Sequence, residues 1–498
     1  MLWFSLGWSP VLLLAALAVG WKRPALELSI VGVLYTLLLV VFGFDTPLAV
    51  ALRAAVDGVL TTLPLLLVVL AGILLTNLMQ AAGSLPRLVE WLSGGVRNTY
   101  HREILITLGV GNFMEGAGVI AEPVTASMLR AAGVEPTGAA ALSIIGYSGL
   151  MTLELAGIIV TVLSLVTGIP VRELGVTAAW LCVPATVMMA ACIPRYLPGS
   201  AAMPHRFFLP LASGLFVGMA ALASALFIGV PLSGMLGGLA LIVVLILIGA
   251  RRLAWNRQLA RDMSPFLFVL ATLLSVNTIP LLKDLTFNRW TLTLRIMPVH
   301  TVTLQPFFSP YLYLFAACGI TLLLFRFSSW ELCAILGKTA KSGLRALAAM
   351  GLFGAMGQMI AYSGYSADFA ELHTGCNIPW LLAHGLETYS GRFYPIFVPL
   401  LGWVGTFLTG YGVASLMLFG HLQVEAARLM GVSATWMAAG LAVGASLGSI
   451  SSPFKIAIAA PLCDALGKEG EILRFTVPWG IASSLLLGMI LWILIYFL

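Results

Sequence analysis

Apolar stretches long enough to cross a bilayer recur from one end of this chain to the other. A helix needs about 20 apolar residues to span the hydrocarbon core of a membrane, and Leu26–Phe44, Leu60–Met79 and Leu473–Leu498 are such stretches. Hydrophobic residues fill 60% of the 498 positions and charged residues only 9%. Because the stretches are continuous, they predict helices and not the alternating strands of an outer-membrane barrel. The expected fold class is an all-α polytopic membrane protein with about 12 to 14 transmembrane helices.

The basic residues lie in short clusters between these apolar stretches. A dispersed pattern of this kind does not favour nucleic acid as a partner, but it is typical of membrane topology, in which positively charged loops face the cytoplasm. It places the N-terminus outside and predicts insertion in a bacterial inner (plasma) membrane, with Met1–Val19 retained as a first helix and not cleaved as a signal peptide. The clusters are Lys22-Arg23; Arg87, Arg97 and Arg102; Arg251-Arg252 with Arg257 and Arg261; and Lys338, Lys341 and Arg345.

Neither a metal nor another cofactor is expected. The six cysteines form no CxxC pair, and cysteines in apolar stretches usually serve as small packing residues. His373 and Cys376 lie close together, but two ligands do not make a metal site.

Two segments in different halves of the chain are similar to each other. Gly111-Asn-Phe-Met-Glu-Gly-Ala-Gly-Val119 shares three glycines, a Phe and a Val with Gly405-Thr-Phe-Leu-Thr-Gly-Tyr-Gly-Val413. Of the helices that precede them, Leu60–Met79 leads into a basic loop and Leu344–Ser363 follows one, so the two are expected to run in opposite directions. Inverted repeats are typical of secondary transporters, which bind substrate between the repeats. The predicted organisation is 1–58, N-terminal helices; 59–203, first inverted repeat; 204–343, scaffold helices and linker; and 344–498, second inverted repeat.

The glycines in the two similar segments predict breaks in the membrane helices. Closely spaced glycines weaken a helix and free backbone polar groups, which a membrane protein tolerates only where the backbone is buried or lines a cavity. We expect re-entrant or discontinuous helices there, with helix N-termini that can receive an anion. The alternative is close helix packing through small residues. The substrate contacts expected in these segments are Asn112, Gly116, Gly118, Thr409, Gly410 and Gly412.

Three carboxylates lie in or near the first segment, namely Glu115, Glu122 and Glu154. An acid at membrane depth costs about 2.5–3.5 kcal/mol, so it is a candidate for function by default. We expect these three to take part in proton coupling, with pairing to a basic residue as the alternative for Glu154.

The second half has hydroxyl groups and a lysine in place of these acids. Ser449-Ile-Ser-Ser-Pro-Phe-Lys455 is a plausible anion site, in which Ser451, Ser452 and Lys455 would contact substrate. Lys455 could instead be a lysine that extends to the membrane interface. His421 is a further candidate for substrate contact or proton relay, with a packing role as its alternative.

Short motifs follow one another along the chain, from Phe113-Met-Glu-Gly116 and Pro123-Val124 to Gly467-Lys-Glu-Gly470 and Arg474-Phe-Thr476. Together they resemble the L-lactate permease family. The resemblance covers most of the chain and implies a proton-coupled symporter for L-lactate, D-lactate or glycolate, not an enzyme, built on inverted repeats. It places Glu115 on the FMEG glutamate of the family, and analogy with related carriers suggests a homodimer. The motifs are Phe113-Met-Glu-Gly116, Pro123-Val124, Gly402-Trp403, Gly405-Thr-Phe-Leu-Thr-Gly410, Leu418-Phe-Gly420, Leu422-Gln423, Ser452-Pro453, Ile456-Ala457, Gly467-Lys-Glu-Gly470 and Arg474-Phe-Thr476.

The chain departs from the usual family pattern around the candidate site. Tyr147 and Leu150 stand where the family usually has Asn and Pro, and Glu154 stands where it usually has glycine. Lys455 follows the Ser-Pro motif by two residues, whereas a lysine is common two residues before it. Two alternatives therefore stay open: a carrier of another small organic anion, driven by protons or sodium, and an ion-translocating subunit of a larger membrane complex.

Overall fold

The chain folds into a helical membrane protein, as predicted. The computed structural model describes residues 2–21, 23–94, 96, 98–197, 204–249 and 256–497. Among these residues, ten helices are long and apolar enough to cross a membrane, and three shorter apolar helices accompany them. The basic residues Lys22, Arg97, Arg251 and Arg252 lie outside the described residues, and the sidedness of the loops stays a prediction.

The α-helices of the described residues follow one another along the chain. They are α1 (Leu2–Ala15), α2 (Ala25–Leu38), α3 (Leu48–Ala81), α4 (Ser84–Gly94), α5 (Thr99–Ile104), α6 (Gly111–Gly116), α7 (Glu122–Ala131), α8 (Pro136–Ser148), α9 (Ile158–Thr167), α10 (Val171–Ala191), α11 (Pro204–Phe227), α12 (Ser233–Gly249), α13 (Arg257–Thr278), α14 (Pro280–Lys283), α15 (Pro310–Leu324), α16 (Ser329–Ala361), α17 (Ile378–Ser390), α18 (Tyr394–Thr409), α19 (Gly412–Met430), α20 (Ala434–Gly448), α21 (Pro453–Ala459) and α22 (Glu469–Phe497).

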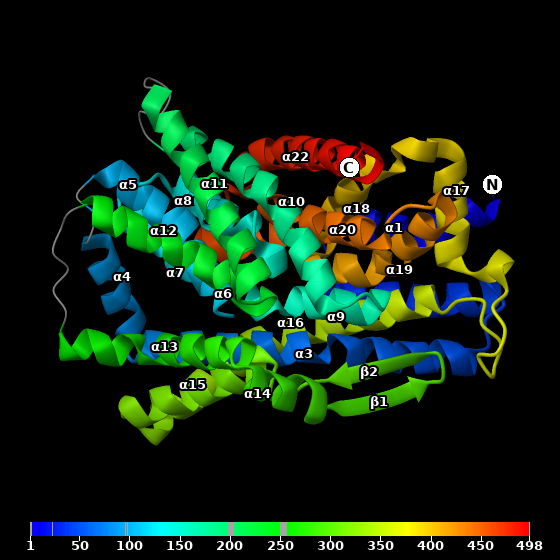
Figure 1. Cartoon of the computed structure of the whole chain (residues 1–498), viewed down its shortest axis with the longest axis horizontal. Coiled ribbons are helices and arrows are strands. Elements are labelled where there is room, and N and C mark those ends of the chain that lie inside the picture. The colour runs from blue at the N-terminus through cyan, green and yellow to red at the C-terminus, as the bar shows by residue number, and fades with distance from the viewer. Residues whose placement is uncertain are drawn as a thin grey trace.

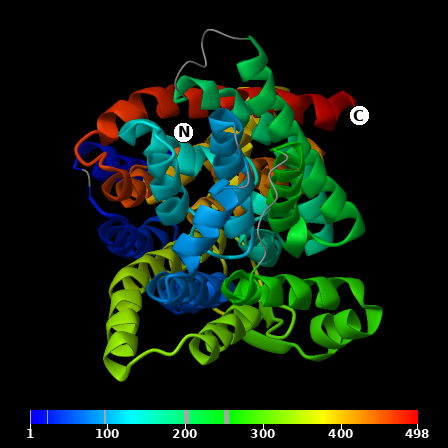
Figure 2. The same cartoon turned by 90° about the vertical axis from the view of Figure 1, so that its left-hand side faces the viewer.

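The helices form two layers. The long helices α3 and α16 pack along each other, and α13 and α15 lie beside them in the lower layer of Figure 1. The upper layer contains α6 to α12 and α17 to α22, and Figure 2 shows the same division from the side. Contacts of α16 with α19 and of α3 with α9 join the layers.

Helices α3 and α16 are antiparallel. Asn77, near the end of α3, donates a hydrogen bond of 3.0 Å to Thr339, near the start of α16, whereas Gly58 near the start of α3 meets Gly354 near the end of α16. The helices that precede the two similar segments therefore run in opposite directions, as expected. The inverted repeat as a whole, and the domain boundaries drawn from it, stay predictions.

Glycine at the crossing of α3 and α16 lets the two backbones touch, which leads to a stability prediction. A Cβ atom at Gly354 would lie 2.6 Å from the carbonyl oxygen of Gly58, so we expect Gly354→Ala to lower the stability of the protein by about 1–3 kcal/mol through overpacking. On the same helix, Gly337 has nothing within 4 Å of an added Cβ, and Gly337→Ala should leave stability unchanged or raise it by up to about 1 kcal/mol. Thermal unfolding in detergent gives the melting temperatures of both variants. Equal melting temperatures for Gly354→Ala and Gly337→Ala would contradict the close contact between α3 and α16.

The polar stretch between α14 and α15 contains a β-hairpin. Strands β1 (Leu292–Met297) and β2 (His300–Leu304) pair antiparallel, with Leu294 opposite Val302. The hairpin lies along α3 (Figure 1). The alternating Thr and Leu or Val residues in both strands are the sequence signal for this pairing.

Both glycine-rich segments break a helix, as predicted. Helix α6 ends at Gly116 and α7 begins at Glu122, with Gly118 at φ +84° between them. Helix α18 ends at Thr409, and Gly410 at φ +83° separates it from α19. A positive φ is unfavourable for residues with a Cβ, so the glycines allow the chain to turn at these points.

Candidate functional site

Two of the three predicted carboxylates flank the break between α6 and α7. Glu115 lies at the end of α6, and its Oε1 accepts a hydrogen bond of 2.7 Å from the backbone N–H of Ala121. Glu122 is the first residue of α7. Both side chains are buried, so the break holds two acids in the interior of the protein and not at its surface.

Lys455 and Tyr147 complete a buried polar cluster with Glu122. The Tyr147 hydroxyl donates a hydrogen bond of 2.5 Å to Glu122 Oε1 and accepts one of 2.7 Å from Lys455 Nζ. Lys455 Nζ also lies 3.5 Å from Glu122 Oε1. The lysine side chain is only 14% exposed. The alternative of a lysine that extends to the membrane interface therefore does not apply to this conformation, because its ammonium group is paired inside the protein.

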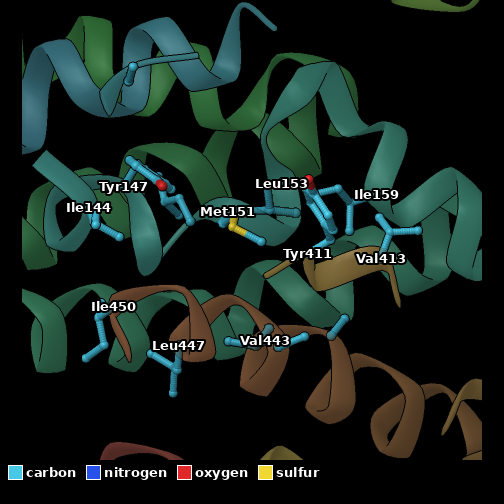
Figure 3. Packing of buried hydrophobic residues seen from close by; sticks show 14 of the residues in the cluster. Ile144, Tyr147, Met151, Leu153, Ile159, Tyr411, Val413, Val443, Leu447 and Ile450 are labelled. Carbon is cyan, nitrogen blue, oxygen red and sulfur yellow. The ribbon is translucent and has the colours of Figure 1, made fainter. Parts of the chain in front are cut away.

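Met151 forms the apolar side of the cluster. Its sulfur lies 3.5 Å from Lys455 Nζ and accepts a 2.8 Å hydrogen bond from Ser449. A Cβ at Gly412, the first residue of α19, would lie 2.6 Å from the Met151 methyl group. Figure 3 shows Tyr147 and Met151 among buried apolar side chains of α9, α19 and α20. These contacts bring the breaks in the two halves together around one lysine.

Glu154 lies in an unusual backbone segment near the same cluster. It connects two 3₁₀ turns, Met151–Leu153 and Leu155–Gly157, in an extended conformation. Leu155 and Ala156 both have φ +50°, a conformation that costs about 1–3 kcal/mol per residue outside glycine. The Glu154 side chain is 0% exposed, and neither of its carboxyl oxygens has a hydrogen-bond partner among the described residues.

The cluster contains more acids than bases. Lys455 is the cation whose charge acts on Glu115 and on Glu154 as well as on Glu122. If all three carboxyl groups were ionised, the cluster would carry a net charge of −2, and uncompensated buried charge is very costly. The described part of the site therefore combines several buried carboxyl groups with the single ammonium group of Lys455.

A comparison with known protein families covers nearly the whole chain. The profile of the L-lactate permease family matches residues 4–498 of the chain. The chain belongs to this family. It is therefore a multi-pass membrane transporter and not an enzyme, and the resemblance drawn from its motifs is confirmed.

Curated relatives match most of the length of this permease. The L-lactate permease of Streptococcus iniae is 26% identical over 454 residues, which cover 86% of this chain and 92% of the relative. The L-lactate permease of Escherichia coli K12 is 25% identical, with coverage of 90% and 87%. The glycolate permease GlcA of the same organism is 23% identical, with coverage of 92% and 90%. Among solved structures, the Alcanivorax borkumensis YdaH transporter aligns with a TM-score of 0.44 at 14% identity, covering 97% of this chain and 98% of that one.

Several predicted substrate contacts are used for packing inside the permease. Asn112 donates to the backbone oxygens of Leu108 at 2.6 Å and Gly146 at 2.8 Å, and so ties α6 to α8. Thr409 donates to the carbonyl of Gly405 at 2.7 Å, and Ser451 to that of Thr476 at 2.7 Å. These side chains support the helix breaks.

The remaining predicted residues divide between the cluster and its surroundings. Ser452 caps α21 by accepting a hydrogen bond of 3.4 Å from the Lys455 N–H, and Gly412 contacts Met151. By contrast, Gly116 packs on the backbone of Met235, Gly118 on Leu314 and Gly410 on Phe454. His421 contacts Gln358 and not the cluster.

Sequence reasoning did not assign a site role to Tyr147 or Met151, although both touch Lys455. For Tyr147 the sequence did contain a signal. Its phenol lies within an apolar stretch rich in Ala and Gly, at a position where the family usually has Asn. Met151 carried no signal, because a methionine in an apolar stretch is usually a packing residue.

A separate cavity of about 250 Å³ lies between α4, α6, α12 and α13. It is lined by apolar side chains, among them Phe113, Met114 and Val124. A buried carboxylate needs hydrogen bonds or a cation, which this cavity does not offer. We therefore place the candidate substrate site at Lys455.

Proposed function

We propose that this permease is a proton-coupled symporter that carries a small 2-hydroxy monocarboxylate, lactate or glycolate, across a bacterial inner membrane. The names of its relatives support the substrate class, since they include L-lactate permeases and a glycolate permease. The observation that carries the proposal is the buried Lys455, bound to Tyr147 and paired with Glu122.

In the proposed cycle, Lys455 exchanges one carboxylate for another. When Glu122 takes up a proton, it no longer compensates the ammonium group, and the carboxylate of the substrate replaces it. The Tyr147 hydroxyl, which now donates to Glu122, becomes available to the incoming anion. One proton and one monovalent anion enter together, so the net charge of the buried site does not change and no uncompensated charge has to cross the membrane.

The 2-hydroxyl group of the substrate would be bound beside the lysine. Ser449 donates to the Met151 thioether, which is a weak acceptor, so a substrate hydroxyl is a better partner for it. Glu115 and Glu154 provide further carboxyl groups that can hold the coupling proton. Glu154 is the stronger candidate of the two, because both of its oxygens lack a partner among the described residues.

Transport by the purified protein tests this proposal. In liposomes, an inward proton gradient should drive accumulation of labelled L-lactate or glycolate. For one-to-one symport the accumulation reaches about tenfold per pH unit, since a tenfold ratio corresponds to about 1.4 kcal/mol. Propionate, which lacks the 2-hydroxyl group, should compete poorly.

Three results would contradict the proposal in different ways. Accumulation driven by a sodium gradient at equal pH would show that sodium, and not the proton, is the coupling ion. If no short 2-hydroxy acid were taken up but another organic anion were, the substrate would belong to another class of anion. A requirement for a stoichiometric partner protein would favour a subunit of a larger complex.

A further inference from the structure

A second buried polar network lies apart from the Lys455 cluster. It connects His300 on β2, Asp57 on α3, Gln358 on α16 and His421 on α19. None of these residues contacts the cluster in the described hydrogen bonds. The network crosses from the layer of α3, α16 and the hairpin to the layer of α9 and α19 (Figure 1).

His300 contacts one acceptor with each ring nitrogen. Its Nδ1 lies 2.7 Å from Asp57 Oδ2, and its Nε2 lies 2.9 Å from the backbone oxygen of Leu165, near the end of α9. A carbonyl oxygen can only accept, so Nε2 must carry a hydrogen. A second hydrogen must lie between Nδ1 and Asp57 Oδ2, because a bare nitrogen facing a carboxylate would be repelled.

The two contacts of the His300 ring therefore require two hydrogens. A neutral histidine beside an ionised aspartate supplies only one, so the pair must hold one extra proton. The extra proton is held either as an imidazolium beside a carboxylate or as a neutral imidazole beside a carboxylic acid. In both forms the pair has a net charge of zero. Its loss leaves a net charge of −1 and only one hydrogen for two contacts, so either the Asp57 contact or the Leu165 contact must break.

The surroundings of Asp57 reinforce this requirement. Asp57 is 0% exposed, and its Oδ1 has no partner among the described residues. Its Oδ2 accepts from the Gln358 amide at 3.2 Å, and Gln358 Oε1 faces His421 Nε2 at 3.2 Å. The side-chain N–H of Gln358 thus donates to Asp57, and the side-chain oxygen of Gln358 accepts from the N–H of His421. Gln358 supplies no charge, so His300 is the group that compensates Asp57.

We propose that Asp57 and His300 form a proton-binding site that latches the β-hairpin and α3 to α9 when the proton is bound. This goes beyond the proposed transport chemistry at Lys455, because it assigns a second proton site to the contact between the two layers. Loss of the proton releases the hairpin from α9 or from α3. Through Gln358, the same change reaches His421 on α19.

The pKa of His300 agrees with such a site. The hairpin is not one of the membrane-spanning helices. Burial lowers the pKa of His300, but the hydrogen bond and charge of Asp57, together with the Leu165 carbonyl, outweigh burial and raise it above the ordinary value. A raised histidine pKa stabilises the folded state below the ordinary value of about 6.5, and this stabilisation is lost as the pH rises through the raised pKa.

Besides His421, which belongs to the network, the described residues place four titratable groups around it. They are Tyr362 on α16, whose ring lies 6.0 Å from that of His300, Tyr365 in the loop that follows, Glu425 on α19, and Arg295 on β1, which donates to its own hairpin turn.

Thermal unfolding between pH 6 and pH 9, without substrate, tests the latch. We expect His300→Gln to lower the melting temperature at pH 6 by about 2 °C or more, and the difference from wild type to disappear toward pH 9. Asp57→Asn should also flatten the pH profile, because an amide N–H can donate to Nδ1 at every pH. The matched control is His384→Gln, an exposed histidine 3.4 Å from Glu387, which should follow the wild-type profile.

The opposite results overturn the proposal. A difference between wild type and His300→Gln that is the same at every pH would assign His300 a packing role only. If the variants do not fold, wild-type hydrogen exchange decides, because protection of residues 292–304 should fall between pH 6 and pH 9 after correction for chemical exchange, and protection of α22 should not. Unchanged protection of the hairpin would refute the latch. Because no substrate is used, these outcomes are independent of whether the protein carries lactate.

Discussion

Lys455→Met is expected to reduce substrate affinity and uptake by about 30-fold or more, because removal of one partner of a buried hydrogen-bonded charge pair costs at least about 2 kcal/mol in binding. Methionine has a similar length and no charge, so it removes the ammonium group that contacts Tyr147 and Glu122. Labelled lactate exchange in liposomes gives the uptake, and a thermal-shift titration gives the affinity.

Two variants make the lysine result specific. Lys468→Met removes an exposed lysine from the loop before α22 and should transport like wild type. Lys455→Arg retains the charge and should retain part of the binding, although arginine cannot occupy a lysine site without loss. Wild-type affinity in Lys455→Met, in protein that is folded by its melting temperature, would remove Lys455 from the substrate site.

Glu122→Gln is expected to abolish accumulation of substrate while exchange of external for internal substrate continues. The glutamine side chain has nearly the same shape as a protonated glutamate and cannot release a proton. It therefore imitates the loaded state at Lys455 and still allows the substrate to bind. In liposomes with a gradient of one pH unit, wild type should accumulate about tenfold, and the variant should only equilibrate.

The control for Glu122→Gln is Glu135→Gln. Glu135 precedes α8, is exposed and makes no side-chain cap to the helix, so its neutral variant should accumulate substrate normally. Glu115→Gln and Glu154→Gln measured in the same assay would identify which carboxyl group carries the coupling proton. Normal accumulation in Glu122→Gln would show that this proton does not pass through Glu122.

The candidate site was only partly accessible from sequence. An acid within an apolar stretch is informative by itself, because its cost at membrane depth does not depend on which helix lies beside it. This reasoning selected Glu115, Glu122 and Glu154, and the hydroxyl-rich segment pointed to Lys455. It could not separate Ser451, which supports the backbone of α22, from residues that face the cluster, because both kinds lie in the same short segment.

The hairpin and its histidine were missed for a different reason. The stretch around His300 is more polar than its neighbours, and membrane topology predicts only that such a stretch lies outside the bilayer. Alternation of side chains predicts strands, but no local pattern indicates that His300 would reach Asp57.

The sequence by itself determined the fold class, the breaks at Gly118 and Gly410 and the presence of buried acids, because helix length, glycine conformation and the cost of charge in lipid are local properties. Only the tertiary structure decided the partners. Lys455 contacts Tyr147 across 308 residues and His300 contacts Asp57 across 243. The first pair depends on how α8 and α21 pack within the upper layer, and the second on how the hairpin packs on α3. Many packings satisfy the same apolar stretches.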